Sequence, residues 1–223
     1  MLISGFVGSV SAQQMTVEKE YSLEEIAEMK NKAVLITTNE GTFMIELFPE
    51  DAPNTVNNFL KLIESGYYDG VVFHRIIPNF MIQAGDPNTI GPDSDRRLWG
   101  QGGPGYTINE EFNTIQHDRG IVSMARSQHV DSAGSQFFIV HKDNNQLDGK
   151  YTAFGRLVPG VPQGLDRIAE LPTNNKNQPI DASSATIIQT SIIDGFTTEH
   201  FPGPDRNDSI TKEHKIGGGI TKT

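Results

Sequence analysis

Short β-prone segments separated by turn signals run through most of this chain, and they constrain its fold more than any other feature. Each segment is rich in Val, Ile, Thr and Phe and is bounded by Gly, Pro, Asn or Asp, the pattern typical of a strand. The predicted strands are 33–39, 42–48, the two halves of 73–86, 121–125, 136–140, 152–157 and 185–193. Many short strands with few helices predict a mainly β fold, built as a barrel capped at its ends.

Three helices are predicted between or before these strands. Residues 21–32 begin with Ser22 and carry Glu25 three positions later, the spacing of a capping box. This helix is expected to pack against the main domain. Residues 54–65 place apolar side chains at i, i+3, i+4 and i+7, the pattern of an amphipathic helix. A shorter helix is predicted over 164–171.

Composition excludes several classes of function. The formal net charge of −10 argues against nucleic acid or an anionic membrane as the main partner, because phosphate binding requires concentrated Lys and Arg. The absence of cysteine excludes disulfides, thiolate catalysis and cysteine-based zinc sites. No apolar stretch reaches the ~20 residues that span a bilayer. The histidines lack the spacing of zinc ligands, so no metal or cofactor is expected, and His74 is predicted to be a hydrogen-bonded residue that lies inward or at the sheet edge.

The run Phe73–Asp86 is the most informative segment for function. It places one arginine among apolar and amide side chains, with neither a nucleophile nor a set of metal ligands. With a period of two, Arg75 is predicted to share one face with Phe73 and Ile77, and Gln83 points the same way after a break. A guanidinium beside an amide and apolar side chains can hold a small apolar group and polarise a nearby amide.

Three further motifs follow this run in order. They are G-I-V-S-M-A-R at 120–126, G-S-Q-F-F-I-V at 134–140 and L-D-G-K-Y-T-A-F-G at 147–155. Through these segments the chain resembles the cyclophilin family of peptidyl-prolyl cis-trans isomerases over residues 33–195. The resemblance implies a closed eight-stranded antiparallel β-barrel capped by two α-helices. It also implies an isomerase that needs no cofactor and whose partners are X-Pro-containing polypeptides.

The chemistry of such an isomerase fits the residues of the run. Rotation about a peptide bond is opposed by a barrier of ~18–20 kcal/mol, because the nitrogen lone pair is delocalised into the carbonyl. At the twisted transition state the lone pair returns to the prolyl nitrogen, so a donor aimed there binds the twisted form better than either planar form. A guanidinium is always charged and rigid. Arg75 is therefore the expected catalytic donor, and Gln83 is expected to hold the guanidinium in place.

The remaining site residues follow from the resemblance. It implies a proline pocket of Phe80, Met81, Phe138 and Leu147, and a substrate groove bordered by Phe73, Ala125, Arg126 and Gln136. The backbone near Arg126 is expected to pair with the residues that precede proline, as in strand addition. Period two separately predicts that Gln136 and Phe138 share one face of a strand, which leaves Phe137 and Ile139 for the barrel interior.

The chain departs from the best-known family pattern at two positions. Gln146 stands where many members carry the tryptophan often implicated in binding cyclosporin. The resemblance therefore carries over catalysis but not cyclosporin binding. Tyr151 stands where some members have histidine, and it still offers an aromatic wall with a polar tip.

The predicted domains are an N-terminal extension (1–32), the isomerase domain (33–195) and a flexible, polar C-terminal tail (196–223). Two interpretations of Met1–Ala12 stay open. Its small final residues resemble a signal-peptidase site, which would make the protein exported; otherwise the segment is the apolar N-terminus of a cytoplasmic protein. Nothing suggests an interface helix, so a monomer is expected.

Two functions remain in competition on the sequence. The first is a prolyl isomerase, and the second is a non-catalytic module of the same fold that captures X-Pro peptides. Retention of Arg75 with Phe80, Gln83 and Phe138 favours the enzyme, because a mere binder could lose the arginine. A scaffold acting through the tail has no motif to support it. The acidic pair Glu110–Glu111 is predicted to be a solvated loop face.

Overall fold

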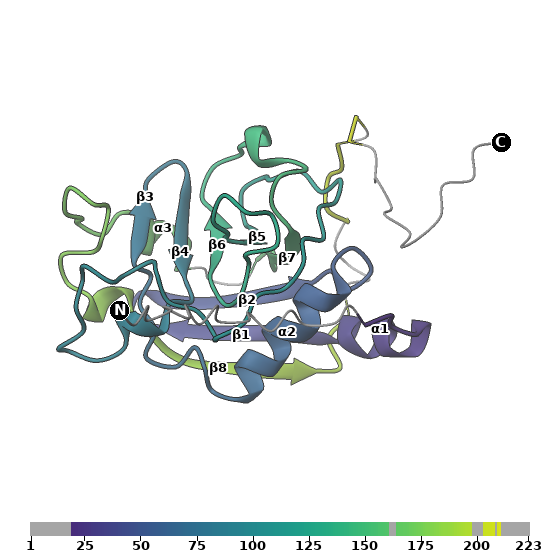
Figure 1. Cartoon of the computed structure of the whole chain (residues 1–223), viewed down its shortest axis with the longest axis horizontal. Helices are drawn as coiled ribbons and strands as arrows, with labels where there is room; N and C mark the ends of the chain where they lie inside the picture. Colours follow the sequence, from purple (N-terminus) through teal and green to yellow (C-terminus); the bar gives the residue numbers. More distant parts are fainter. Residues whose placement is uncertain (1–18, 161–163, 198–202, 208, 211–223) are drawn as a thin grey trace, which may run out of the picture.

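Eight antiparallel strands form one curled sheet in the computed structural model, which describes residues 19–160, 164–197, 203–207 and 209–210 (Figure 1). The strands are β1 (Lys32–Thr38), β2 (Gly41–Leu47), β3 (Arg75–Ile77), β4 (Met81–Ala84), β5 (Ile121–Met124), β6 (Phe137–Val140), β7 (Ala153–Leu157) and β8 (Ile187–Asp194). Their order in the sheet is β3-β4-β6-β5-β7-β2-β1-β8. The mainly β prediction and the expected strands are confirmed.

The helices are α1 (Leu23–Lys30), α2 (Pro53–Glu64) and α3 (Leu165–Ala169), with short 3₁₀ turns at Pro87–Thr89, Asn145–Leu147 and Ser183–Ala185. The predicted capping box of α1 is present, since Ser22 Oγ accepts from the Glu25 amide and the Glu25 carboxylate accepts from the Ser22 amide. This helix packs against α2, β1 and β2, as expected. No helix in the described part of the chain has the length and apolar character needed to cross a membrane.

The expected closed barrel is wrong, because the sheet is a curled half-barrel with two unjoined end strands. β3 and β8 stand at opposite ends of the strand order and do not pair with each other. An isolated bridge between Val72 and Thr186 joins the segments that precede these two strands, with hydrogen bonds from Phe73 N to the Ala185 carbonyl (2.8 Å) and from Ile187 N to the Val71 carbonyl (2.8 Å). β3 has three residues, which is too short to complete a ladder around the barrel.

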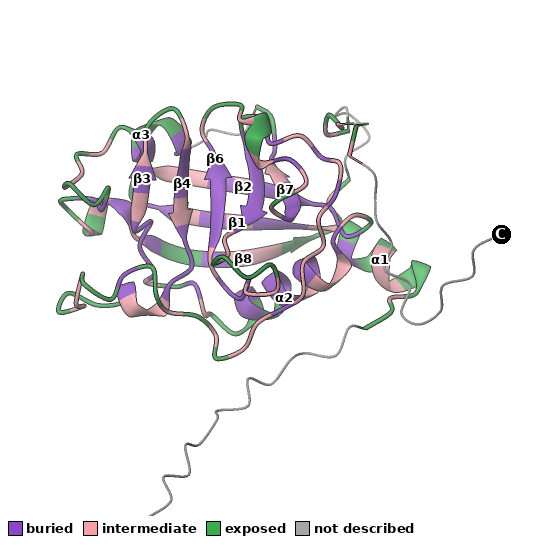
Figure 2. Cartoon of the chain, turned by 45° about the horizontal axis from the view of Figure 1, so that its top comes forward, coloured by how far each residue is buried: buried purple, intermediate pink, exposed green. Residues whose placement is uncertain are grey.

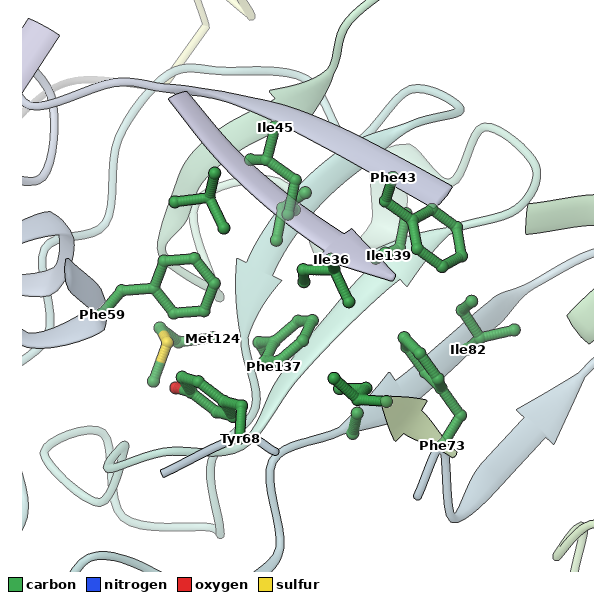
Figure 3. Close-up of a cluster of buried hydrophobic side chains, with 14 of the residues drawn as sticks. Ile36, Phe43, Ile45, Phe59, Tyr68, Phe73, Ile82, Met124, Phe137 and Ile139 are labelled. Atoms are coloured by element: carbon green, nitrogen blue, oxygen red, sulfur yellow. The ribbon is translucent and has the colours of Figure 1, made fainter. Parts of the chain in front are cut away.

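The inner face of the sheet packs on α2 to form the main core (Figure 3). The Phe59 ring of α2 lies 5.4 Å from Phe137, 5.0 Å from Phe154 and 5.3 Å from Tyr68, and all four rings are fully buried. Tilted and edge-on pairs at these distances stabilise a core beyond the area that they bury. Figure 2 shows the buried residues concentrated in the middle of the sheet and on the inner side of α2.

The strand alternation predicted for β6 is confirmed and separates the core from a second apolar cluster. Phe137 and Ile139 belong to the main core, whereas Phe138 belongs to the second cluster on the opposite face of the same strand. The two faces of a strand alternate residue by residue, so adjacent phenylalanines serve different purposes. The site described below lies on the Phe138 side.

The prediction that Glu111 lies on a solvated loop face is wrong. Its Oε1 accepts from the Asn54 amide at 2.9 Å and its Oε2 from the Thr55 amide at 2.8 Å. The residue at the N-cap of α2, Ala52, has no side chain that can accept these hydrogen bonds. A carboxylate at the positive end of the helix dipole therefore replaces the missing cap, from a loop distant in sequence.

Some terminal predictions fall on residues that the structure does not describe. Met1–Ala12 lies outside the described residues, and so do 198–202, 208 and 211–223 of the predicted tail. The described residues 203–207 and 209–210 run beside the main domain, where Arg206 forms an isolated bridge with Ile115.

Candidate active site

Two antiparallel strands place the predicted catalytic pair side by side. Arg75 on β3 is the register partner of Gln83 on β4. Arg75 Nη1 lies 3.5 Å from Gln83 Oε1, at the long end of the hydrogen-bond range. Gln83 Nε2 then donates to Gln136 Oε1 at 2.9 Å, and Gln136 Nε2 donates to the Gly102 carbonyl at 2.8 Å. A relay of two amides thus joins the guanidinium to the loop 100–105.

Arg75 is a cation in a partly dry setting. Its side chain is half-buried, and burial lowers the pKa of the guanidinium below its usual value, an effect that Tyr151 partly offsets. Arginine keeps its charge in proteins regardless. Within the part of the chain that the structure describes, no carboxylate forms an ion pair with Arg75. Its guanidinium carbon lies 5.9 Å from the centre of the Phe80 ring.

The second apolar cluster lies next to this guanidinium. Its buried members include Met81 and Phe138, and its partly exposed rim is formed by Ile77, Phe80, Ala125, Leu147 and Tyr151. Phe138 meets Tyr151 edge-on, with ring centres 5.5 Å apart. The predicted pocket residues Phe80, Met81, Phe138 and Leu147 are therefore brought together, and Gln146 lies exposed on the neighbouring 3₁₀ turn.

Arg126 forms a cationic rim beside the cluster. Its guanidinium carbon lies 4.8 Å from the centre of the Tyr151 ring and 5.5 Å from that of Phe112, and its Nε donates to the Lys150 carbonyl at 2.9 Å. The arginine is therefore held between two aromatic faces. The adjoining backbone is anchored to β6, because the Ala125 amide donates to the Gln136 carbonyl at 2.9 Å.

A hollow of about 500 Å³ adjoins these side chains. Its walls include Gln83, Ala125, Arg126 and Gln136 together with the loop residues 100–107. The apolar cluster and this more polar hollow meet at Ala125, which belongs to both. An extended peptide is the kind of ligand that fits such a surface, with one apolar residue in the cluster and its neighbours along the hollow.

Phe73 does not border this groove, and that prediction is wrong. The strand β3 begins at Arg75, so the alternation assumed from Phe73 onward does not apply before it. Phe73 is fully buried in the main core, where its ring lies 5.8 Å from Phe43 and 6.3 Å from Phe137. Its contribution is to the packing that supports β3.

His74 takes the inward one of its two predicted placements, but without the expected hydrogen bonds. It is 3% exposed, and neither ring nitrogen has a hydrogen-bond partner in the described structure. Burial lowers the pKa of His74 to about 4, although the nearby Asp86 carboxylate opposes the shift. The imidazole is therefore neutral at physiological pH.

A buried hydrogen-bonded network of Asp148, His117 and Ser123 lies behind the apolar cluster and was not predicted from the sequence. His117 Nδ1 lies 3.1 Å from Asp148 Oδ1, and His117 Nε2 lies 3.1 Å from Ser123 Oγ. The His117 ring stacks on Phe138, with centres 6.1 Å apart and planes at 21°. All three polar residues are buried, so the chain supports the cluster from behind and offers no nucleophile to solvent. Only their distance in sequence concealed them, since no local motif joins them.

The chain matches a known protein family over most of its length. The family model described as "Cyclophilin type peptidyl-prolyl cis-trans isomerase/CLD" matches residues 33–192. This chain belongs to the cyclophilin family. A relative named "Peptidyl-prolyl cis-trans isomerase-like 3" from Rhizopus delemar is 40% identical over 173 residues, covering 73% of this cyclophilin and 98% of the relative. The resemblance inferred from the four motifs is confirmed.

Other relatives are longer proteins. "Peptidyl-prolyl cis-trans isomerase-like 2" from Cryptococcus neoformans is 42% identical over 167 residues, which cover 71% of this chain but only 28% of the relative. This cyclophilin therefore matches little more than a quarter of that protein's length.

Solved structures agree with the fold. A cyclophilin-type peptidyl-prolyl cis-trans isomerase from Cryptosporidium parvum has a TM-score of 0.64 and 35% identity, and the match covers 73% of this chain and 97% of that one. A structure of the same protein in the presence of the dipeptide Ala-Pro has the same TM-score and 36% identity, with coverage of 72% and 98%. The cyclophilin AquaCyp293 from Hirschia baltica, at 24% identity and a TM-score of 0.56, supports the fold alone.

The buried histidine gives a prediction for stability against pH. The pKa of His74 is lowered in the folded state, so the unfolded chain binds more protons below pH 6.5. The stability that depends on a neutral His74 is present above pH 6.5 and is lost as the pH falls towards about 4. The loss is about 3 kcal/mol at ~1.4 kcal/mol per pKa unit. The pKa of His117 is also lowered by burial, which adds to the loss.

Urea unfolding between pH 4 and 7 measures this slope. We expect His74→Phe to flatten the slope, because the variant has no group to protonate at that position. Substitution of the exposed His129 by glutamine is the control and should leave the slope as in the parent. An unchanged slope in His74→Phe would show that His74 is not held neutral by burial.

Proposed function

We propose that this cyclophilin accelerates rotation about X-Pro peptide bonds, with Arg75 donating a hydrogen bond to the prolyl nitrogen of the twisted bond. One observation carries the proposal: the half-buried Arg75 guanidinium lies at the edge of an apolar cluster and forms no ion pair with a carboxylate among the described residues. Beyond the contact with Gln83, such a guanidinium has further N–H donors that can bind a ligand. Family membership supports isomerase activity in general.

The required energy is within reach of such a site. An acceleration of about 10⁵-fold corresponds to about 7 kcal/mol of differential binding, at ~1.4 kcal/mol per tenfold. One preorganised, water-shielded donor supplies about 3–4 kcal/mol. Immobilising the proline ring while its acyl partner turns contributes the remainder. The amide relay through Gln83 and Gln136 favours the donor further, because a guanidinium held before substrate binds needs less reorganisation during rotation.

The apolar cluster is the proposed proline pocket. The ring would lie against Phe138, Met81 and Leu147, with Phe80 closing the side nearest Arg75. The residues that precede proline would lie along the backbone of Ala125 and Arg126 and into the adjoining hollow, bordered by Gln136. Tyr151 and the Arg126 side chain stacked on it would form the outer wall. In this arrangement only apolar and hydrogen-bonding contacts act, so no proton or covalent bond changes hands.

We also propose that residues 33–195 form the isomerase domain and that 1–32 and 196–223 are extensions to it. The second candidate function is a module that binds X-Pro peptides without accelerating their exchange. Both functions use the same pocket, so binding alone does not separate them. The rate at which the bound X-Pro peptide exchanges between cis and trans separates the two functions.

Replacing the donor tests the catalytic role. We expect Arg75→Ala to lower the rate of cis–trans exchange by about 10²–10³-fold, the usual loss for one preorganised donor. Thermal stability should change little. The variant loses the contacts of Arg75, but it also no longer carries the free-energy cost of a partly desolvated charge. Exchange NMR on an Ala-Pro peptide with catalytic amounts of protein measures the rate.

Arg97→Ala is the matched control for this variant. Arg97 is exposed and bound to Asp95, so its loss should leave the exchange rate unchanged. If Arg75→Ala retained near-parental turnover, the role given to Arg75 would be wrong. If the parent bound the peptide without accelerating exchange, the binding module would be the correct function.

Two adjacent phenylalanines test the pocket. Phe138→Ala should weaken binding of the Ala-Pro peptide by about 1–3 kcal/mol, because it removes the ring that forms the pocket floor. Phe137→Leu is the control: it alters the core on the other face of β6, so it should lower the unfolding midpoint and leave peptide affinity as in the parent. Chemical-shift titration gives both affinities. Parental affinity in Phe138→Ala would place the proline ring elsewhere.

A further inference from the structure

A segment beyond the matched family region is docked on the back of the apolar cluster. Residues 203–207 follow the end of the family match at 192 and run antiparallel to 114–116. Gln116 N donates to the Asp205 carbonyl at 2.8 Å, and Asn207 N donates to the Thr114 carbonyl at 2.6 Å. With residues 209–210, this stretch is called the C-terminal strap. It lies beside the loops of the half-barrel in Figure 1.

One ion pair anchors the strap to the main domain. Arg206 contacts both carboxylate oxygens of Asp51, at 2.7 and 3.0 Å, and the Asp51 side chain is only 7% exposed. Gln116 Nε2 also donates to the Arg206 carbonyl at 3.0 Å. Two-pronged pairing with a largely buried carboxylate fixes the strap more firmly than an exposed ion pair would.

The other end of the strap contacts the loop that carries two predicted pocket residues. Asn207 Nδ2 lies 3.4 Å from Asp148 Oδ2, and Asn145 Nδ2 lies 3.3 Å from the same oxygen. The Ile210 side chain covers Gly149: a Cβ on that glycine would lie 3.3 Å from Ile210 Cδ1. These contacts fall between Leu147 and Tyr151, on the rim of the apolar cluster.

Asp148 connects the strap to Phe138, the floor of the proposed pocket, through His117. Its Oδ1 accepts from the His117 amide at 2.8 Å and lies 3.1 Å from His117 Nδ1. The His117 ring in turn stacks on Phe138. Ile115, the bridge partner of Arg206, is itself a fully buried member of the cluster that contains Phe138. The strap therefore reaches the floor by two routes, one through the Asp148 carboxylate and one through Ile115.

We propose that the C-terminal strap is a positioning element for the proline pocket, in which Asn207 and Ile210 hold the loop 147–151 against the cluster. The inference rests on the proposed function, because it assigns the pocket to proline. Without the strap, Asp148 keeps its hydrogen bonds with His117 but loses the one from Asn207. Gly149 loses its contact with the Ile210 side chain. The loop then samples more conformations, and a ligand binds only the fraction in which the pocket is formed. Arg75 lies on β3, away from the strap, so the rotation step itself is spared.

The test uses the full chain with an Arg206→Ala/Ile210→Ala double variant, which removes the anchor and the cover. Exchange NMR on the Ala-Pro peptide should show KM raised about threefold to tenfold with kcat within about twofold of the parent. In ¹³C-methyl spectra the Leu147 signals should shift and broaden. Asn207→Ala should raise KM less than the double variant, and Asn207→Gln, which keeps an amide donor, should restore part of the loss.

Lys30→Ala is the matched control. Lys30 pairs with the exposed Glu50, next to Asp51 in sequence, and forms no ion pair with the described residues of the strap. It should leave KM and the Leu147 signals unchanged. If the double variant lowered the unfolding midpoint but kept the parental KM and Leu147 signals, the strap would serve stability alone and the proposal would be overturned.

Failure of this inference is distinguishable from failure of the proposed function. If the parent did not accelerate exchange, the proposed catalysis would be wrong, and peptide affinity by titration would replace KM as the readout for the strap. A weaker affinity in the double variant would then still support positioning. An affinity equal to that of the parent would contradict it.

Discussion

The proposed site depends on one arrangement of charge: the Arg75 guanidinium is partly removed from water and, within the described ranges, forms no ion pair with a carboxylate. Arg75 keeps its charge despite burial, and the Gln83 side-chain amide and the Phe80 ring lie beside its guanidinium. Desolvation strengthens every interaction that such a charge makes with a ligand, since the local dielectric is low. An ion pair would have neutralised this effect. The proposed function requires such a charge, because the lone pair returns to the prolyl nitrogen only as the peptide bond twists.

Strand alternation allows one thin sheet to supply both a core and a binding surface. On β6, Phe137 packs on α2 while Phe138 faces the pocket, and on β4 the same division separates Ile82 from Met81. A half-barrel filled on its inner side by aromatic rings holds the outer side chains with little freedom. The buried chain from Asp148 to His117 extends this support to Phe138. Residues outside the proposed pocket therefore support the side chains that form it.

Much of this could be predicted from sequence, where the signal was local. The capping box of α1, the period of α2 and the alternation of β6 each use neighbouring residues, and the structure follows them. Predictions failed where the cause lay far away in the chain. Glu111 caps a helix that lies more than fifty positions earlier, and the partners of His117 are set by tertiary packing alone. Phe73 was misplaced because the strand starts two residues later than its pattern suggested.

The central proposal is that Arg75 acts on the twisted bond rather than on peptide binding. The most direct measurement is the exchange rate of an X-Pro peptide saturated with enzyme, compared between the parent and Arg75→Lys. Lysine retains the charge but loses the rigid planar fork. We predict that the bound-state exchange rate falls by at least about tenfold while the dissociation constant stays within about twofold. Equal exchange rates in the two proteins, or a loss confined to affinity, would contradict the account.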